Sequence, residues 1–199
     1  MFSPKIFKFF LFIIVLVNIS VNAFSVEPRE FVQLTVNKAS EALTKNYMKE
    51  EKIEKLKEIA SETVDIRGLA FYTLGVHRKT ITPEQKKEYI QLFEKYFLKT
   101  FASRLAIYTD TKITVDYQKK LNQNYTLVSS TLVATENRPQ IKIDWRIYTK
   151  NPDNLLIRDL VIEGVSLARA QKEEFNSIIQ SNDGDINSLL LSLTGFNNK

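Results

Sequence analysis

The sequence of 199 residues contains no cysteine, one histidine, and only five glycines and five prolines. Without cysteine the chain can form no disulfide, carries no thiolate nucleophile and lacks the residue that anchors a lipoprotein's lipid. A single histidine, His77, provides no plausible zinc-binding set without cysteine partners. A glycine-rich phosphate loop is also missing. The sequence therefore predicts neither a metal site nor a cofactor.

Long hydrophobic runs are scarce, and the longest, Phe9 to Val17, lies near the start. It follows two lysines, Lys5 and Lys8, and precedes Val21-Asn22-Ala23, which is the order of a secretory signal peptide. We expect cleavage after Ala23. An uncleaved anchor helix is the alternative, but nine apolar residues fall short of the roughly 20 that a membrane span needs.

Removal of residues 1–23 as the signal peptide leaves residues 24–199, enough for a single well-buried domain. The formal net charge is +5, and the predicted signal peptide holds two of the positive charges. The lysines that remain are scattered among glutamates, which is typical of solvated helix faces. We therefore predict a secreted, soluble protein that does not bind nucleic acid.

The hydrophobic period changes from helical to strand-like and back along the chain. Thr82-Pro83-Glu84-Gln85 combines a cap, a proline at the first helical position and a capping-box glutamine. The pattern predicts an α+β fold, with a curved antiparallel sheet of about four strands packed with helices. The expected helices cover about 28–47, 49–63, 66–74, 83–108, 166–179 and 185–193, and the expected strands about 113–117, 126–135, 141–148 and 155–163.

The segment from Leu155 to Phe175 predicts a strand, a turn at Gly164 and a helix that begins at once. Ser166 is the natural N-cap of this helix. A nucleophilic role for Ser166 is the alternative, but the second glycine of a nucleophile elbow is missing.

Three carboxylates, Asp144, Asp159 and Glu163, are candidates for acid–base chemistry. They fall in predicted strands beside Arg146 and Arg158, so cross-strand ion pairs are the simpler interpretation. The residues thus argue against an enzyme. The 13 phenylalanines and eight tyrosines fit either an ordinary core or a ligand cavity, and composition leaves both open.

Several segments, in order, resemble the MlaC family of periplasmic phospholipid-binding proteins, also called toluene-tolerance auxiliary components. The most distinctive is Asp159 with Glu163-Gly164-Val165-Ser166, followed by Gln171, Lys172, Glu174 and Phe175. Ile143-Asp144-Trp145-Arg146-Ile147 is similar to a family strand. Val64-Asp65 through Leu74-Gly75 and Thr82-Pro83-Glu84-Gln85 to Phe93 resemble an earlier family block. Together these segments extend over roughly residues 30 to 193.

The resemblance implies a sheet and helices that enclose an apolar cavity for the acyl chains of a phospholipid. It also implies a periplasmic shuttle that carries phospholipid between an outer-membrane lipoprotein–porin complex and an inner-membrane ABC transporter with an MCE-domain subunit. Such a shuttle maintains the lipid asymmetry of the outer membrane, and it contacts membranes only transiently. The expected pocket residues are apolar and lie on the long helix, two strands and a turn: Phe93, Phe97, Phe101, Ile143, Trp145, Ile147, Leu160, Ile162 and Val165.

Two other function classes stay open at this stage. One is a periplasmic adaptor with a filled core that binds only proteins, and the other is a lipid hydrolase with an unrecognised site. For the carrier, we expect a basic stretch to face an acidic surface of the transporter's MCE subunit or the anionic membrane beside it. That stretch consists of Arg67, Arg78, Lys79, Lys86 and Lys87.

Overall fold

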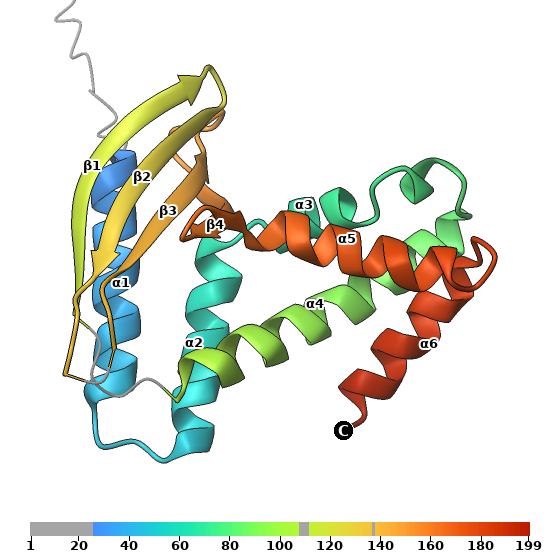
Figure 1. Cartoon of the computed structure of the whole chain (residues 1–199), viewed down its shortest axis with the longest axis horizontal. Coiled ribbons are helices and arrows are strands. Elements are labelled where there is room, and N and C mark those ends of the chain that lie inside the picture. The colour runs from blue at the N-terminus through green and yellow to red at the C-terminus, as the bar shows by residue number, and fades with distance from the viewer. Residues whose placement is uncertain (1–25, 108–111, 137) are drawn as a thin grey trace, which may run out of the picture.

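The computed structural model describes residues 26–107, 112–136 and 138–199, and it is α+β as expected (Figure 1). The helices are α1 (Pro28–Thr44), α2 (Lys49–Thr63), α3 (Ile66–Thr73), the 3-10 helix η1 (His77–Lys79), α4 (Pro83–Leu105), α5 (Leu167–Gln180) and α6 (Ile186–Asn197). The strands are β1 (Ile113–Asn122), β2 (Tyr125–Leu132), β3 (Ile141–Tyr148), β4 (Leu156–Ile162) and β5 (Val165–Ser166). The expected cleavage site after Ala23 lies outside the described residues.

The five strands pair in chain order, β1-β2-β3-β4-β5, and every pairing is antiparallel. This confirms the predicted antiparallel sheet and adds the two-residue strand β5. The extra strand forms because Glu163 and Gly164 both have positive φ, 48° and 82°, which folds the chain back within two residues. Ser166 then caps α5, since its hydroxyl accepts from the Arg169 amide at 3.1 Å.

The long helix α4 begins as predicted. The Gln85 amide donates to the Thr82 hydroxyl at 3.2 Å, and the Thr82 amide donates to the Gln85 side chain at 3.1 Å, which completes the capping box. The helix ends at Leu105, so its expected extension to residue 108 is too long by about one turn. Its main packing partners are α2, α6 and α3.

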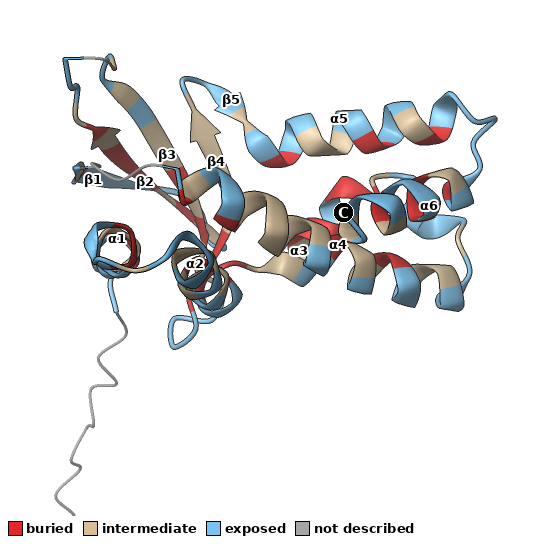
Figure 2. Cartoon of the chain, turned by 90° about the horizontal axis from the view of Figure 1, so that it is seen from below, coloured by how far each residue is buried: buried red, intermediate tan, exposed pale blue. Residues whose placement is uncertain are grey.

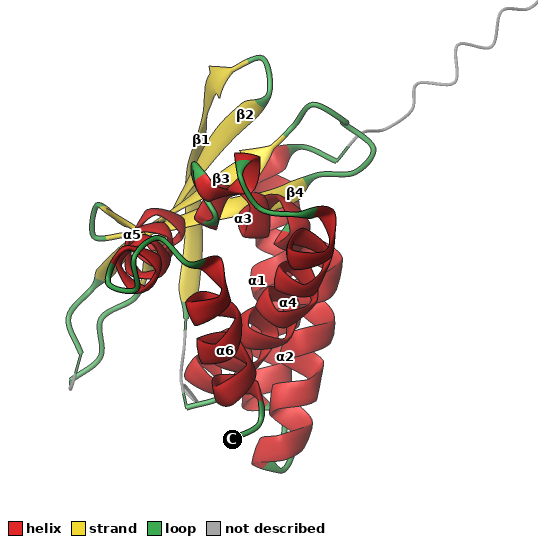
Figure 3. Cartoon of the chain, turned by 90° about the vertical axis from the view of Figure 1, so that its right-hand side faces the viewer, coloured by secondary structure: helices red, strands yellow, loops and turns green. Residues whose placement is uncertain are grey.

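The helices lie in two groups relative to the sheet. Helix α1 runs along β1 and β2, and α5 continues from the β4–β5 hairpin and packs on β4, whereas α2, α4 and α6 pack mainly on one another (Figures 1 and 3). Buried residues concentrate where these elements face each other (Figure 2). Among the described residues, none of the helices has the length and apolar character that a bilayer crossing requires.

Candidate functional site

Four aromatic rings form a row along one face of α4, because residues four apart share a helix face. The ring centroids of Tyr89 and Phe93 lie 5.9 Å apart, those of Phe93 and Phe97 6.1 Å, and those of Phe97 and Phe101 5.6 Å. Tyr89 and Phe93 are buried, whereas Phe97 and Phe101 are only partly buried. The row therefore runs from the core to a margin that water reaches.

The inner end of this row is closed by α5. Phe175 meets the edges of Tyr89 and Phe93 in nearly perpendicular contacts, with centroids 6.3 and 6.2 Å away. Complete burial raises the pKa of the Tyr89 hydroxyl, since desolvation penalises the phenolate. The Tyr89 and Thr73 hydroxyls form a buried hydrogen bond of 2.7 Å, which satisfies both groups.

The sheet contributes a second apolar surface. Trp145 and Ile147 alternate on one face of β3 and are buried, and Val128 lies opposite Trp145 on β2. The Trp145 indole donates to the Ser130 hydroxyl at 2.7 Å, and this hydroxyl donates to the Ile143 carbonyl at 3.2 Å. The polar atoms of this face are thus paired with each other.

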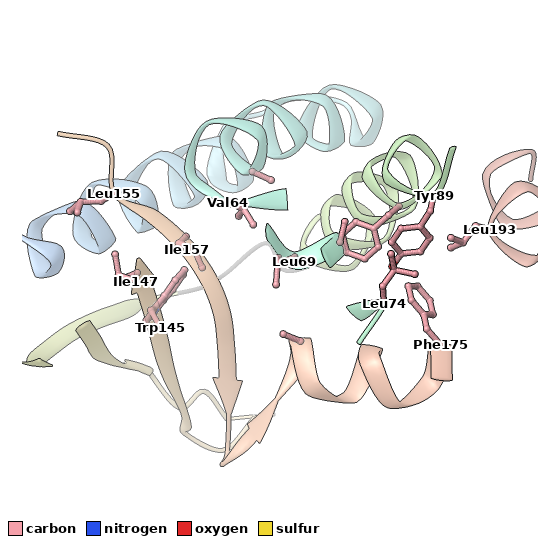
Figure 4. Close-up of a cluster of buried hydrophobic side chains, with 14 of the residues drawn as sticks. Val64, Leu69, Leu74, Tyr89, Trp145, Ile147, Leu155, Ile157, Phe175 and Leu193 are labelled. Atoms are coloured by element: carbon pink, nitrogen blue, oxygen red, sulfur yellow. The ribbon is translucent and has the colours of Figure 1, made fainter. Parts of the chain in front are cut away.

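One hydrophobic cluster joins the two surfaces. In Figure 4 the labelled side chains extend from Leu155, Ile147 and Trp145 on the sheet side, past Val64 and Leu69, to Tyr89, Phe175 and Leu193 on the helical side. Sheet and helices consequently share one core.

Seven of the nine predicted pocket residues belong to this cluster. Three are buried members, Phe93, Trp145 and Ile147, and four are partly buried residues packed against it, Phe97, Phe101, Ile143 and Leu160. We call these last four the seam margin, and we use seam for the part of the cluster where the side chains of α4 and those of the sheet meet. Ile162 is partly buried outside the cluster, and Val165 is 58% exposed on β5. The pocket role of all nine stays a prediction.

Helices α5 and α6 also contribute to this region, which the sequence pattern did not predict. Phe175, Leu189 and Leu193 are buried members of the same cluster. Their helical spacing indicates an apolar face, but the pattern does not state which other element that face meets. The buried Tyr89, also a member of the cluster, is not among the predicted pocket residues.

A polar junction ties the helices to the sheet at β4. The Asp65 carboxylate caps α3 by accepting from the Gly68 amide at 2.7 Å, and it forms an ion pair of 2.5 Å with Arg158. Arg158 also donates to the Tyr125 hydroxyl at 3.2 Å and lies 4.1 Å from the Tyr148 ring centroid. The Asp65 backbone amide donates to the Ile157 carbonyl at 2.9 Å. The turn between α2 and α3 is therefore fixed to the sheet.

The candidate acid–base carboxylates have structural partners. Asp159 is 5% exposed, accepts from the Ser166 hydroxyl at 2.6 Å and the Ala168 amide at 3.0 Å, and pairs across strands with Arg146 at 3.4 Å. It thereby holds the start of α5 on β4. The Ser166 hydroxyl is likewise occupied as donor and acceptor.

The expected ion pairs are only partly correct. Arg146 pairs across strands with Asp159 as predicted, but Arg158 turns to Asp65, on the helical layer. Asp144 instead bonds Ser129 and pairs with Lys142 on its own strand, and the Glu163 carboxylate accepts from the Lys142 amide.

Among the residues that the structure describes, no three histidine or acidic side chains lie close enough together to hold a metal ion. His77 is half-buried, and its ring lies 3.0 Å from the Asn176 side chain. A shallow hollow of about 270 Å³ lies between the start of α1 and the β3–β4 loop. None of the predicted pocket residues lines it.

Fold and site together define an α+β protein whose open antiparallel sheet and helical layer share one apolar core with a partly exposed margin. The chain belongs to the MlaC family, because the family described as MlaC protein matches residues 32–194.

The structure is also similar to that of a phospholipid-binding protein from Ralstonia solanacearum in complex with a phospholipid. The TM-score is 0.71 at 19% sequence identity, over 86% of this chain and 97% of the other. At this identity the likeness shows the common fold. Comparison with curated proteins gives no match.

Proposed function

We propose that this protein is a periplasmic phospholipid carrier that holds acyl chains along the seam between α4 and the sheet. The seam margin is the observation that carries the proposal. Phe97 and Phe101 on α4, with Ile143 and Leu160 on the sheet, leave apolar surface partly in contact with water at the edge of a common core. Acyl chains would cover that surface. Membership of the MlaC family and the fold shared with a lipid-bound protein support the same function.

The energetics of lipid extraction require such a surface. Each methylene taken from water is worth about 0.8 kcal/mol, so two acyl chains with some 30 methylenes carry on the order of 25 kcal/mol of apolar burial. A carrier can remove a lipid from a bilayer only by replacing nearly all of this contact. A few polar contacts to a headgroup would not suffice. This requirement favours a long apolar seam and needs no catalytic group.

The polar junction at β4 suggests the end of the seam at which a lipid enters. Asp65 and Arg158, with the backbone bond between Asp65 and Ile157, tie the helical layer to β4. The outer end of the α4 aromatic row has no such tie to the sheet among the hydrogen bonds and ion pairs of the described residues, and it ends in the partly buried Phe101. Separation of the layers at Phe97 and Phe101 would leave the junction intact. In this proposal the acyl chains enter from that end.

As a carrier, the protein would receive phospholipid from one membrane complex and deliver it to another. An outer-membrane lipoprotein–porin complex and an inner-membrane ABC transporter with an MCE-domain subunit are the proposed partners, and outer-membrane lipid asymmetry is the proposed outcome. The basis is family membership. A non-enzymatic role is consistent with the candidate carboxylates, because Asp159 and Asp144 already form hydrogen bonds and ion pairs with neighbouring protein groups.

Native mass spectrometry of the purified protein, with lipid extraction in parallel, tests the proposal. Co-purified intact phospholipid is the expected result. Absence of bound lipid, with no uptake from vesicles, would favour an adaptor with a filled core. Lysolipid or free fatty acid in place of intact lipid would favour a hydrolase.

A further inference from the structure

A basic and aromatic corner lies where α3, η1 and the start of α4 meet. Residues 66–87 contain five basic residues and a single acidic one, Glu84. The turn that carries η1 lies at the outer end of the molecule, beyond the start of α4 (Figure 1, upper right). This corner is separate from the seam margin, since Lys86 and Phe101 are four turns apart on α4.

The fold brings the charges of this corner together around aromatic rings. The Lys86 ammonium lies 4.9 Å from the Phe71 ring centroid, and the Arg67 guanidinium lies 5.7 Å from the same centroid. Lys172, from α5, lies 5.5 Å from the centroid of Tyr72. Lys172 was absent from the basic stretch expected from sequence, because it is some 90 residues away in the chain and only the fold adds it.

These cations are not neutralised by the protein itself. Within the part of the chain that the structure describes, Arg67, Lys86 and Lys172 form no ion pair, and neither do Arg78 and Lys79. Two apolar side chains stand among them. Val76, directly before η1, is 69% exposed, and Tyr72 is 43% exposed. The corner thus combines unpaired positive charge with exposed aliphatic and aromatic surface.

We propose that this corner docks the protein on an anionic phospholipid bilayer. Lysine and arginine attract anionic headgroups, tyrosine favours the water–lipid interface, and Val76 at the protruding turn can enter the upper acyl region. Unpaired positive charge beside the exposed Val76 and Tyr72 favours a bilayer over a protein partner, because an anionic bilayer offers negative headgroups and an apolar layer directly beneath them. The inference rests on the proposed carrier function only in that a carrier must approach membranes.

Vesicle sedimentation with the full-length mature chain tests the charges. Vesicles of phosphatidylcholine alone are compared with vesicles of equal parts phosphatidylcholine and phosphatidylglycerol, at low and at physiological ionic strength. Each basic residue near an anionic surface strengthens binding about fivefold, so Lys79→Gln, Lys86→Gln and Lys172→Gln together should weaken binding to the mixed vesicles about 100-fold. The matched control is Lys119→Gln with Lys120→Gln on β1, both exposed, which should change binding little.

The absence of cysteine permits a second, independent measurement. Val76→Cys creates a unique site for an environment-sensitive fluorophore. Its emission should shift to the blue when anionic vesicles are added. The same label at Met48→Cys, which is 74% exposed in the turn between α1 and α2, should not shift.

Three results would overturn the inference: equal binding to both kinds of vesicle, equal binding of wild type and the triple glutamine variant, or no binding of wild type to either vesicle. The last result would exclude a bilayer as the occupant of the corner and leave an acidic protein partner as the alternative to test. Each of these outcomes is compatible with phospholipid that co-purifies in the seam, so failure of the docking surface is distinguishable from failure of the carrier function.

Discussion

Phe97 provides the sharpest test of the proposed seam. It stacks between Phe93 and Phe101, at interplanar angles of 16° and 15°, and it is only partly buried. We predict that Phe97→Glu abolishes co-purification of phospholipid while the protein stays folded. Phe97→Leu, which keeps the site apolar, should retain the lipid.

The expected cost to folding follows from these contacts. A fully buried phenylalanine contributes about 1.5–3 kcal/mol, and Phe97 buries part of that surface. Each aromatic neighbour adds about 0.5–1.5 kcal/mol. Loss of the ring should therefore reduce the free energy of unfolding by about 2–4 kcal/mol. A domain with a stability of about 5–15 kcal/mol generally survives such a loss.

Phe97→Glu should weaken lipid binding more severely than it weakens folding. An ionised carboxylate held against an acyl chain loses its hydration without gaining a partner, at a cost of about 3 kcal/mol or more. That cost corresponds to at least about 100-fold weaker binding. The assay is lipid extraction and native mass spectrometry of each variant, with thermal unfolding to confirm the fold.

Lys95→Glu is the matched control, because it places a carboxylate on the exposed face of the same helix. Its lipid content should equal that of wild type. A folded Phe97→Glu protein with undiminished phospholipid would refute the assignment of the seam as the lipid site.

Three further predictions concern stability and processing. Asp65→Ala removes the α3 cap and leaves Arg158 unpaired, so it should lower the free energy of unfolding in urea by about 2 kcal/mol. Asp65→Asn can still cap and loses only the ion pair, so it should cost about half as much; no loss of stability in Asp65→Asn would exclude a role for the ion pair, and a loss equal to that of Asp65→Ala would exclude one for the cap. Burial raises the pKa of folded Tyr89 above that of the unfolded chain, so its stabilising effect is present below about pH 10 and is lost above it. Wild type should therefore lose stability relative to Tyr89→Phe by about 1.4 kcal/mol per pH unit above pH 10, and parallel pH profiles would contradict this. N-terminal sequencing of the periplasmic fraction should begin near Phe24, and recovery only in membranes with Met1 retained would refute the cleavage.

Local signals in the sequence were sufficient for most of the secondary structure. The capping box at Thr82, the cap at Ser166 and the turn at Gly164 were each predicted and found, because their hydrogen bonds join residues three or fewer positions apart or depend on one residue's φ. The strand alternation around Trp145 is confirmed in part, because Trp145 and Ile147 are buried whereas Ile143 on the same face is only partly buried. The two-residue strand β5 was missed because such short pairing leaves no periodic signal.

Only the tertiary structure decided which of these faces meet. The sequence placed Arg158 beside strand carboxylates, but it pairs with Asp65, 93 residues earlier, because the turn between α2 and α3 packs on β4. Lys172 joins the basic corner for the same reason, through the packing of α5 on α3. An amphipathic pattern specifies that a face is buried but not its partner, since apolar burial is non-directional. Family and fold class could thus be predicted from sequence, whereas the contacts between distant segments, such as Asp65 with Arg158 and Lys172 with Tyr72, are set only by the tertiary structure.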